Sequence, residues 1–125
     1  MILVDSSVWV DHLRSTEPGL FNLLEGNHVL MHAFVIGELA CGNLRNRAEL
    51  LKLFRDLPQA AVAEDSEVLF LIERNQLMGR GIGYVDAHLL ASVMLHGAAK
   101  FWTRDRRLLE AADSLGLAHS ANCHK

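Results

Sequence analysis

Short apolar runs alternate along the chain with longer segments in which apolar residues recur at helical spacing. The apolar runs predict strands at residues 1–4, 28–31 and 101–103, with further short strands at 60–63 and 117–119. The segments of helical spacing predict helices at residues 8–14, 18–25, 34–41, 47–57, 65–78, 84–96 and 106–115. Strands that alternate with helices form parallel sheets covered on both faces. The pattern therefore indicates an α/β protein with a mainly parallel sheet of four to five strands.

Residues that start and stop helices mark several of these boundaries. Ser6 or Ser7 is expected to cap the first helix and Asn46 the fourth, because short polar side chains accept hydrogen bonds from the first N–H groups. The glycine-rich segment 79–83 is predicted to be a turn. It lacks the glycine spacing, after a strand, that binds dinucleotide phosphates.

Length and composition favour one domain over residues 1–125, because half of the 125 residues are hydrophobic and can form a sizeable core. The apolar runs are too short to cross a bilayer, and the N-terminal run lacks the basic start of a signal peptide. Two cysteines form no disulfide framework, so a cytoplasmic location is expected, with Cys41 as a small core residue. The net charge of −3 does not decide for or against a nucleic-acid partner.

Four acidic side chains lie at the ends of apolar runs or inside them: Asp5, Glu38, Asp86 and Asp105. Asp5 and Asp105 follow predicted strands, and residues just past the carboxyl ends of parallel strands gather in one crevice. Like charges about 4 Å apart repel by about 4 kcal/mol at an effective dielectric constant near ~20. Carboxylates gathered in this way need protons or a counter-charge, which a hard divalent cation supplies. The sequence therefore predicts a magnesium site.

Each acid also has a purely structural interpretation. Asp86 would fall in the first turn of a helix, where the helix dipole favours a negative charge, and Asp105 could cap the helix that begins at residue 106. Asp5 has less need of such a role, because two serines beside it suit capping better. Glu38 lies in an otherwise apolar helix, where burial near a cation is expected.

Polar residues beside the acids extend the candidate site. The hydroxyl groups of Ser7 and Thr103 could hold a metal-bound water or a phosphate oxygen, and a local backbone hydrogen bond is the alternative for each. Arg104, Arg106 and Arg107 are candidate phosphate contacts on RNA, with a solvated helix start as the alternative.

A stripe of His88, Ser92 and His96 recurs every four residues and therefore shares one helix face. We expect it to be a solvated or subunit-facing surface rather than a zinc site, because no third ligand has the spacing of a metal site. His119, Cys123 and His124 are expected to belong to a frayed terminus.

Four segments, taken together and in this order, carry a resemblance: VDSSVW at residues 4–9, VIGEL at 35–39, VDAHLLA at 85–91 and WTRDRRL at 102–108. The chain resembles the PIN-domain ribonucleases, and more narrowly the VapC toxins of bacterial type II toxin–antitoxin systems. The resemblance covers nearly the whole chain. Single motifs of this kind are weak, whereas four in order are highly specific.

This resemblance implies a three-layer α/β/α sandwich and a Mg²⁺- or Mn²⁺-dependent endoribonuclease. The family's acidic quartet corresponds to Asp5, Glu38, Asp86 and Asp105, as metal ligands and catalytic residues, and its hydroxyl position corresponds to Thr103. The resemblance also implies structured RNA such as tRNA or rRNA as substrate. It further implies a homodimer, and inhibition by a cognate VapB-type antitoxin that inserts a basic side chain into the acidic pocket.

Two other classes of function stay open at this point. A PIN-like module that binds RNA or an antitoxin without catalysis would share the fold, although the intact quartet argues against it. A DNA-directed two-metal nuclease would share the chemistry. An Asp-x-Asp phosphatase is disfavoured, because Ser7 stands where the second acid would be needed.

Overall fold

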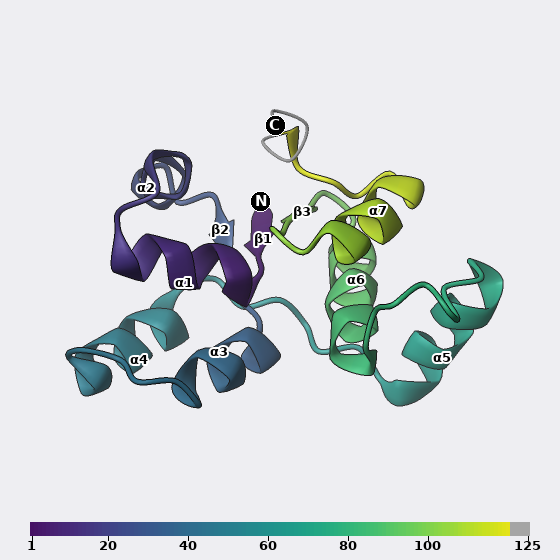
Figure 1. Ribbon diagram of the computed structural model, residues 1–125, viewed down its shortest axis with the longest axis horizontal. Helices are drawn as coiled ribbons and strands as arrows, with labels where there is room; N and C mark the ends of the chain where they lie inside the picture. The colour runs from purple at the N-terminus through teal and green to yellow at the C-terminus, as the bar shows by residue number, and fades with distance from the viewer. Residues whose placement is uncertain (121–125) are drawn as a thin grey trace.

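A parallel sheet lies at the centre of the computed structural model, which describes residues 1–120 (Figure 1). The strands are β1 (Ile2–Val4), β2 (Val29–Leu30) and β3 (Lys100–Trp102), in the order β2-β1-β3. Strand β1 pairs with both neighbours in parallel, and Val4 at its end stands opposite Trp102. The first strand of the chain and the last one are therefore adjacent.

The described residues form three strands rather than the predicted four to five. Single parallel bridges, Met31 with Gln59 and Phe101 with Ala118, extend the two edges of the sheet at the positions of the two missing strands. Beyond Gln59 burial alternates irregularly: Ala60 and Ala63 are buried, whereas Val62 is 47% exposed. A strand needs successive pairs along a neighbour, so one bridge at each edge ends the ladder there.

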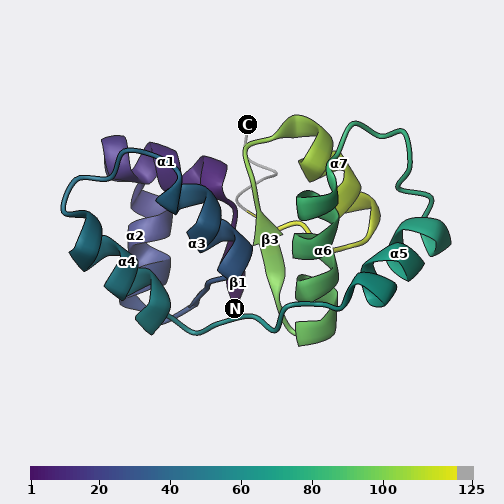
Figure 2. The ribbon, with the colours of Figure 1, turned by 90° about the horizontal axis from the view of Figure 1, so that it is seen from below.

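Seven helices in the described part of the chain lie in two groups on opposite sides of the sheet (Figures 1 and 2). One group contains α1 (Ser6–Arg14), α2 (Pro18–Glu25), α3 (Ala33–Ala40) and α4 (Arg47–Asp56). The other contains α5 (Asp65–Arg74), α6 (Tyr84–His96) and α7 (Arg106–Ser114). This layering confirms the predicted α/β/α fold class.

Helix α6 is buried on almost all sides along its middle. Every residue from Ala87 to Val93 is buried, as expected for a helix that is apolar all round and packed between other elements. The predicted bounds, residues 84–96, are confirmed at both ends. The helix stops at Gly97, whose φ of 84° is a conformation that favours glycine.

Burial differs from the prediction at three polar or thiol side chains. His88 and Ser92 are 3% and 1% exposed, so the predicted surface stripe is wrong for them, while His96 is exposed. Spacing shows that these residues share a face, but it cannot tell which face packs inward when the helix is apolar all round. Cys41 was predicted to lie in the core and is exposed, because it follows the last turn of α3, where the chain leaves the helix.

Helix ends also differ from the prediction in detail. Asp5, rather than a serine, is the N-cap of α1, and Asn46 occupies the N-cap of α4 without a side-chain cap bond. Helix α5 ends at Arg74, four residues early, because Gln76 takes a left-handed conformation with φ of 52°.

Further sequence predictions concern the membrane and the C-terminal segment. Within residues 1–120 no helix combines the length and apolar character that a membrane span requires. The predicted frayed terminus is wrong for His119, which is half-buried and whose backbone N–H donates to the Phe101 carbonyl oxygen at 2.8 Å; Cys123 and His124 lie outside the described residues.

His32 and Ser92 form a buried hydrogen bond between the two groups of helices. His32 is the N-cap of α3, and its Nδ1 accepts the N–H of Phe34 at 2.9 Å. Nε2 therefore carries the ring proton and donates it to Ser92 Oγ at 2.9 Å. Burial, and secondarily the nearby His88, lower the pKa of His32 to about 4, so the folded protein holds this ring neutral.

We expect His32 to make the protein less stable in acid. The unfolded ring takes up a proton below its ordinary pKa of 6.5, whereas the folded ring does so only near about 4. The free energy of unfolding should therefore fall as the pH drops through this window, by at most about 3 kcal/mol from this residue.

His32→Asn isolates this contribution, because its amide oxygen can still accept the Phe34 N–H and does not titrate. Urea unfolding of both proteins at several pH values measures the difference between them. Equal loss of stability in acid for wild type and variant would show that His32 is not the cause.

Candidate active site

Asp5 lies at the carboxyl end of the central strand, against the end of β3. It is 6% exposed, and its backbone N–H donates to the Trp102 carbonyl oxygen at 2.9 Å. Because β1 and β3 are parallel and in register, Asp5 and Thr103 emerge at the same edge of the sheet. The fold thus brings together two predicted site residues that are far apart in the sequence.

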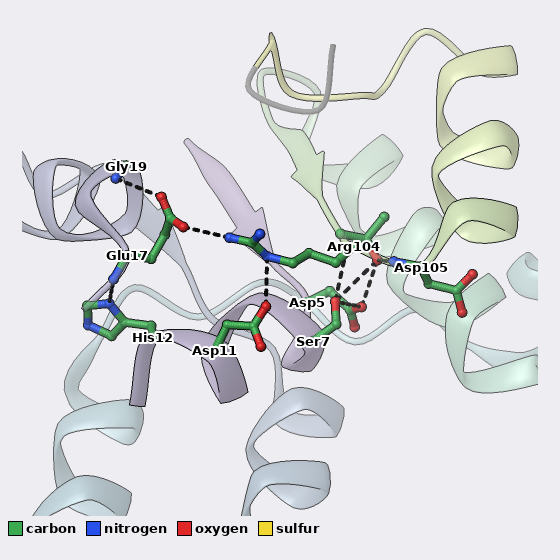
Figure 3. Close-up of polar contacts among 9 residues, drawn as sticks. Asp5, Ser7, Asp11, His12, Glu17, Gly19, Arg104 and Asp105 are labelled. Carbon is green, nitrogen blue, oxygen red and sulfur yellow. Dashed lines mark hydrogen bonds and ion pairs between the residues drawn. The ribbon is translucent and has the colours of Figure 1, made fainter. Parts of the chain in front are cut away.

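Two hydroxyl groups hold the Asp5 carboxylate (Figure 3). Ser7 Oγ and Thr103 Oγ1 each donate to Asp5 Oδ2, both at 2.8 Å. Each hydroxyl also accepts a backbone N–H, Ser7 from Arg104 at 3.0 Å and Thr103 from Asp105 at 3.1 Å. Because a hydroxyl has a single proton, these N–H donors leave it directed at Asp5. Within residues 1–120 no hydrogen bond reaches Asp5 Oδ1, so a ligand can use that oxygen.

Asp86 is half-buried in the first turn of α6. Burial raises the pKa of the Asp86 carboxyl, and the negative charges of Asp5 and Asp105 raise it further. A hydrogen bond from the Gly83 N–H to Asp86 Oδ2, at 3.0 Å, acts in the opposite direction. Asp86 therefore lies in the first turn of α6, as predicted, where it binds the N–H of the N-cap Gly83 and interacts with the charges of Asp5 and Asp105, and its role as a metal ligand stays a prediction.

Glu38 reaches the same group of acids from α3. The residue as a whole is exposed, which corrects the expectation that it would be buried. Partial burial of its carboxyl group is nevertheless the main cause that raises the pKa of Glu38, and the charges of Asp5 and Asp86 add to it. A hydrogen bond from the Ser6 hydroxyl partly offsets this shift.

Asp105 is the N-cap of α7, the structural role considered from the sequence. Its Oδ1 accepts the backbone N–H groups of Arg107 at 3.0 Å and Leu108 at 3.2 Å. In Figure 3 its carboxylate points away from that of Asp5. Its charge still contributes to the raised pKa of Asp86, so Asp105 lies at the edge of the cluster.

The four acids interact electrostatically but do not enclose an ion as they stand. Within residues 1–120 no three side chains of His, Cys, Asp or Glu are arranged to hold a metal ion. Three of the acids bind protein donors through one carboxylate oxygen and keep a second oxygen for a ligand. Their mutual repulsion is what a divalent cation relieves, and oxygen donors suit a hard cation. The carboxylate donors therefore suit Mg²⁺ or Mn²⁺ in kind, while their side chains do not surround one position within residues 1–120.

Arg104 is engaged within the protein, although the sequence made it a candidate RNA contact. Its Nε lies 3.1 Å from Asp11 Oδ2, and its Nη2 lies 2.7 Å from Glu17 Oε2. Asp11 lies on α1, and Glu17 is the N-cap residue just before α2 (Figure 3). The guanidinium group is thus bound to two carboxylates on the opposite side of the Asp5 site from α7.

Arg107 lies across the glycine-rich turn that precedes α6. A Cβ atom placed on Gly81 would lie 2.5 Å from Arg107 Cδ and 2.6 Å from its Nη1. Gly81 also has a φ of 80°, which few residues other than glycine adopt. The turn therefore needs glycine here for its own conformation and for the Arg107 side chain. Arg106 is exposed.

A cleft of about 640 Å³ lies beside the acid cluster, between α1, α3 and the start of α4. It is lined by Val10, Leu13, Arg14, Glu38, Leu39, Gly42, Asn43, Leu44, Arg45 and Leu50. Glu38 belongs both to this cleft and to the acid cluster, so the two are continuous.

The sequence matches the PIN domain family over residues 2–114. The chain belongs to the PIN domain family. This PIN domain is similar to a protein named Ribonuclease VapC32 from Mycobacterium tuberculosis strain CDC 1551 / Oshkosh. The identity is 48% over 118 residues, which is 94% of this chain and 95% of that protein.

The protein of the same name from Mycobacterium tuberculosis strain ATCC 25618 / H37Rv is similar to this PIN domain to the same extent, 48% over 118 residues. These findings confirm the resemblance to VapC-type PIN domains that four sequence segments indicated. The roles of the individual site residues remain predictions.

Sequence reasoning missed the partners that hold the acids in this PIN domain. Gly83, whose backbone N–H binds Asp86, stands three residues before an acid at a helix start, and this capping-box spacing could have indicated the contact. No sequence signal pairs Arg104 with Asp11 or Glu17, because those contacts depend on how the first two helices pack.

Proposed function

We propose that this PIN domain is a Mg²⁺- or Mn²⁺-dependent endoribonuclease toxin that hydrolyses phosphodiester bonds in structured RNA such as tRNA or rRNA. The observation that carries the proposal is the Asp5 carboxylate. It lies nearly buried at the end of the central strand, and two hydroxyl groups donate hydrogen bonds to it. Its negative charge also contributes to the raised pKa values of Glu38 and Asp86. Similarity to proteins named ribonucleases supports RNA as the substrate.

Asp5, Glu38, Asp86 and Asp105 would hold the cation through carboxylate oxygens. When bound, the ion lowers the pKa of water and stabilises negative charge on phosphate and leaving oxygens. Ser7 and Thr103 keep Asp5 in one orientation. Glu38 and Asp86 are both candidates to take a proton from the attacking water, because burial first and neighbouring negative charges second raise the pKa of each carboxyl. Attack by water would leave a 5′-phosphate and a 3′-hydroxyl end.

Digestion of RNA and DNA substrates side by side, with added Mg²⁺, tests the proposal. We expect cleavage of RNA alone, with 5′-phosphate ends, and loss of cleavage when a chelator is present. Cleavage of DNA at a similar rate would favour the two-metal DNA nuclease. Absence of cleavage of folded RNA would favour the alternative function, a PIN-like module that binds RNA or an antitoxin without catalysis.

We propose that Arg106 and Arg107 contact RNA phosphates near the site. Arg106 is exposed, and Arg107 lies over the turn that leads to Asp86. Guanidinium groups are well suited to phosphate oxygens. Arg104 stays a prediction as an RNA contact, and its two ion pairs weaken that assignment.

Gly81→Ala is expected to raise the KM for RNA several-fold, because the added methyl group displaces the Arg107 side chain. It should also destabilise the protein by about 1 kcal/mol through the left-handed backbone. Gly79→Ala is the matched control: Gly79 has a φ of 71°, but nothing lies within 4 Å of an added Cβ.

Steady-state cleavage assays on both variants separate backbone strain from the displacement of Arg107. An equal KM in the two variants would contradict the role of Arg107.

We further propose a cytoplasmic homodimer that a VapB-type antitoxin inhibits. The cleft combines apolar side chains with Glu38 at the acid cluster and with Arg14 and Arg45, so it suits an antitoxin segment that has apolar side chains, a basic side chain directed at Glu38 and acidic side chains near the two arginines. Leu13→Glu is expected to abolish co-purification with the antitoxin and to leave RNA cleavage intact.

Light scattering measures the oligomeric state, and a monomer at micromolar concentration would contradict the homodimer.

A further inference from the structure

Arg104 connects the loop after β3 to the N-terminal helices at three points. Its guanidinium group is ion-paired with Asp11 on α1 and with Glu17 at the start of α2. Its backbone N–H donates to Ser7 Oγ at 3.0 Å. Ser7 and Asp11 are one turn apart on α1, so this residue fastens the loop to two successive turns of the same helix (Figure 3).

The two carboxylates that bind Arg104 are themselves arranged by the fold. Glu17 is the N-cap of α2, where its Oε1 accepts the Gly19 N–H at 3.2 Å and its Oε2 binds Arg104. The backbone N–H of Glu17 donates to His12 Nδ1 at 3.0 Å. A single exposed ion pair contributes little to stability. One planar guanidinium group that meets two positioned carboxylates has a defined geometry.

The position of this loop decides how Asp5 is held. The backbone N–H groups of Arg104 and Asp105 occupy the acceptor sides of the Ser7 and Thr103 hydroxyls, whose protons then go to Asp5 Oδ2. If the loop moves from α1, the Ser7 hydroxyl loses the Arg104 N–H donor and Thr103 moves with the loop, so the two contacts that orient Asp5 no longer hold together.

Charge also argues against Arg104 as a phosphate contact. One positive guanidinium group lies between two carboxylates, so the cluster carries a net negative charge. A phosphate that approached it would meet repulsion from Asp11 and Glu17.

We propose that Arg104 is a positioning residue, which holds the loop after β3 on α1 and thereby orients Asp5 through Ser7 and Thr103. The inference rests on the proposed ribonuclease function for its kinetic test. It has a second test in cation binding, which needs no cleavage.

The kinetic test uses Arg104→Met and the double variant Asp11→Asn/Glu17→Gln. Both should lower kcat about tenfold to a hundredfold, as expected when a residue that supports a metal ligand is removed. The KM for RNA and its salt dependence should change by less than about twofold.

The double variant distinguishes the two roles of Arg104 by the sign of its effect. It frees Arg104 and removes two negative charges, so an RNA contact would gain affinity and KM would fall. A higher KM in Arg104→Met with kcat retained, or an unchanged kcat in the double variant, would overturn the proposal. Lys52→Met/Asp56→Asn removes an exposed ion pair on α4 and is the matched control, with kcat unchanged.

Titration with Mn²⁺ in the absence of RNA gives the second readout. The affinity for Mn²⁺ should fall about tenfold or more in Arg104→Met and in the double variant, and not in the α4 control. Equal Mn²⁺ affinity in all variants would overturn the positioning role. A wild-type protein that binds Mn²⁺ but does not cleave RNA would refute the ribonuclease proposal. The positioning role of Arg104 would then be decided by the Mn²⁺ titration alone.

Arg104→Lys guards against a variant that fails to fold. Its ammonium group keeps the charge but cannot bind two carboxylates with the same planar geometry, so partial recovery of kcat is expected. Full loss of kcat in a folded Arg104→Lys protein together with normal Mn²⁺ affinity would contradict the proposal.

Discussion

Asp5→Asn is expected to reduce RNA cleavage at least about a thousandfold while the protein stays folded. The asparagine side chain has the same shape as aspartate, and its amide oxygen can accept the hydroxyl protons of Ser7 and Thr103 at the position of Oδ2. Its NH₂ group then takes the place of Oδ1. A cation that needs an oxygen ligand would meet a hydrogen-bond donor instead.

The matched control for this substitution is Asp113→Asn, on an exposed residue at the far end of α7. It removes the same charge and should leave cleavage unchanged. Single-turnover assays on a defined RNA measure both variants, and circular dichroism verifies the fold. Cleavage by Asp5→Asn at more than about a tenth of the wild-type rate would exclude Asp5 as a cation ligand.

Removal of divalent cations should abolish cleavage, and Mg²⁺ or Mn²⁺ should restore it. The same ions should raise the thermal midpoint of the protein, because they offset the burial and the mutual repulsion that raise the pKa values of Glu38 and Asp86. Binding of the cation competes with protons on these two carboxyls, so its affinity should decrease as the pH falls through their raised pKa values.

Without cations, the contribution of Glu38 and Asp86 to the free energy of unfolding increases as the pH falls, whereas the affinity for the cation decreases. A carboxyl whose folded pKa is raised binds protons more readily in the folded state, so Glu38 and Asp86 favour folding as the pH falls and oppose it near neutrality. Thermal melts with and without Mn²⁺, over a range of pH, measure both trends. A midpoint that Mn²⁺ leaves unchanged near neutral pH would contradict cation binding at this cluster.

Much of the fold could be predicted from the sequence, because periodicity and glycine positions are local signals. The bounds of α6 follow from its apolar stretch and from Gly97, and Asp5 follows the central strand as expected. The sequence could not show that each predicted edge strand pairs through a single bridge. A short apolar segment such as 60–63 has no signal that distinguishes one bridge from a continuous ladder.

The places of the acids in the fold could be predicted better than the groups that hold them, and the roles of the acids remain predictions. Asp5 and Thr103 could be placed at one edge because parallel strands put their carboxyl ends together. The burial of His88 and the exposure of Glu38 depend on which neighbours pack against each helix, which spacing does not encode. The partners of Arg104 are of the same kind.

The hydrogen bond between Thr103 and Asp5 joins residues 98 positions apart in the chain. A ribosome that synthesises this protein has therefore made most of it before the Asp5 carboxylate can be oriented. Fragments released by premature termination before β3 would lack the Thr103 hydroxyl and the strand that precedes it, so they could not hold Asp5 as the full chain does. The order of synthesis therefore means that the Asp5 site is assembled only after Thr103, in the last fifth of the 125 residues, has been made.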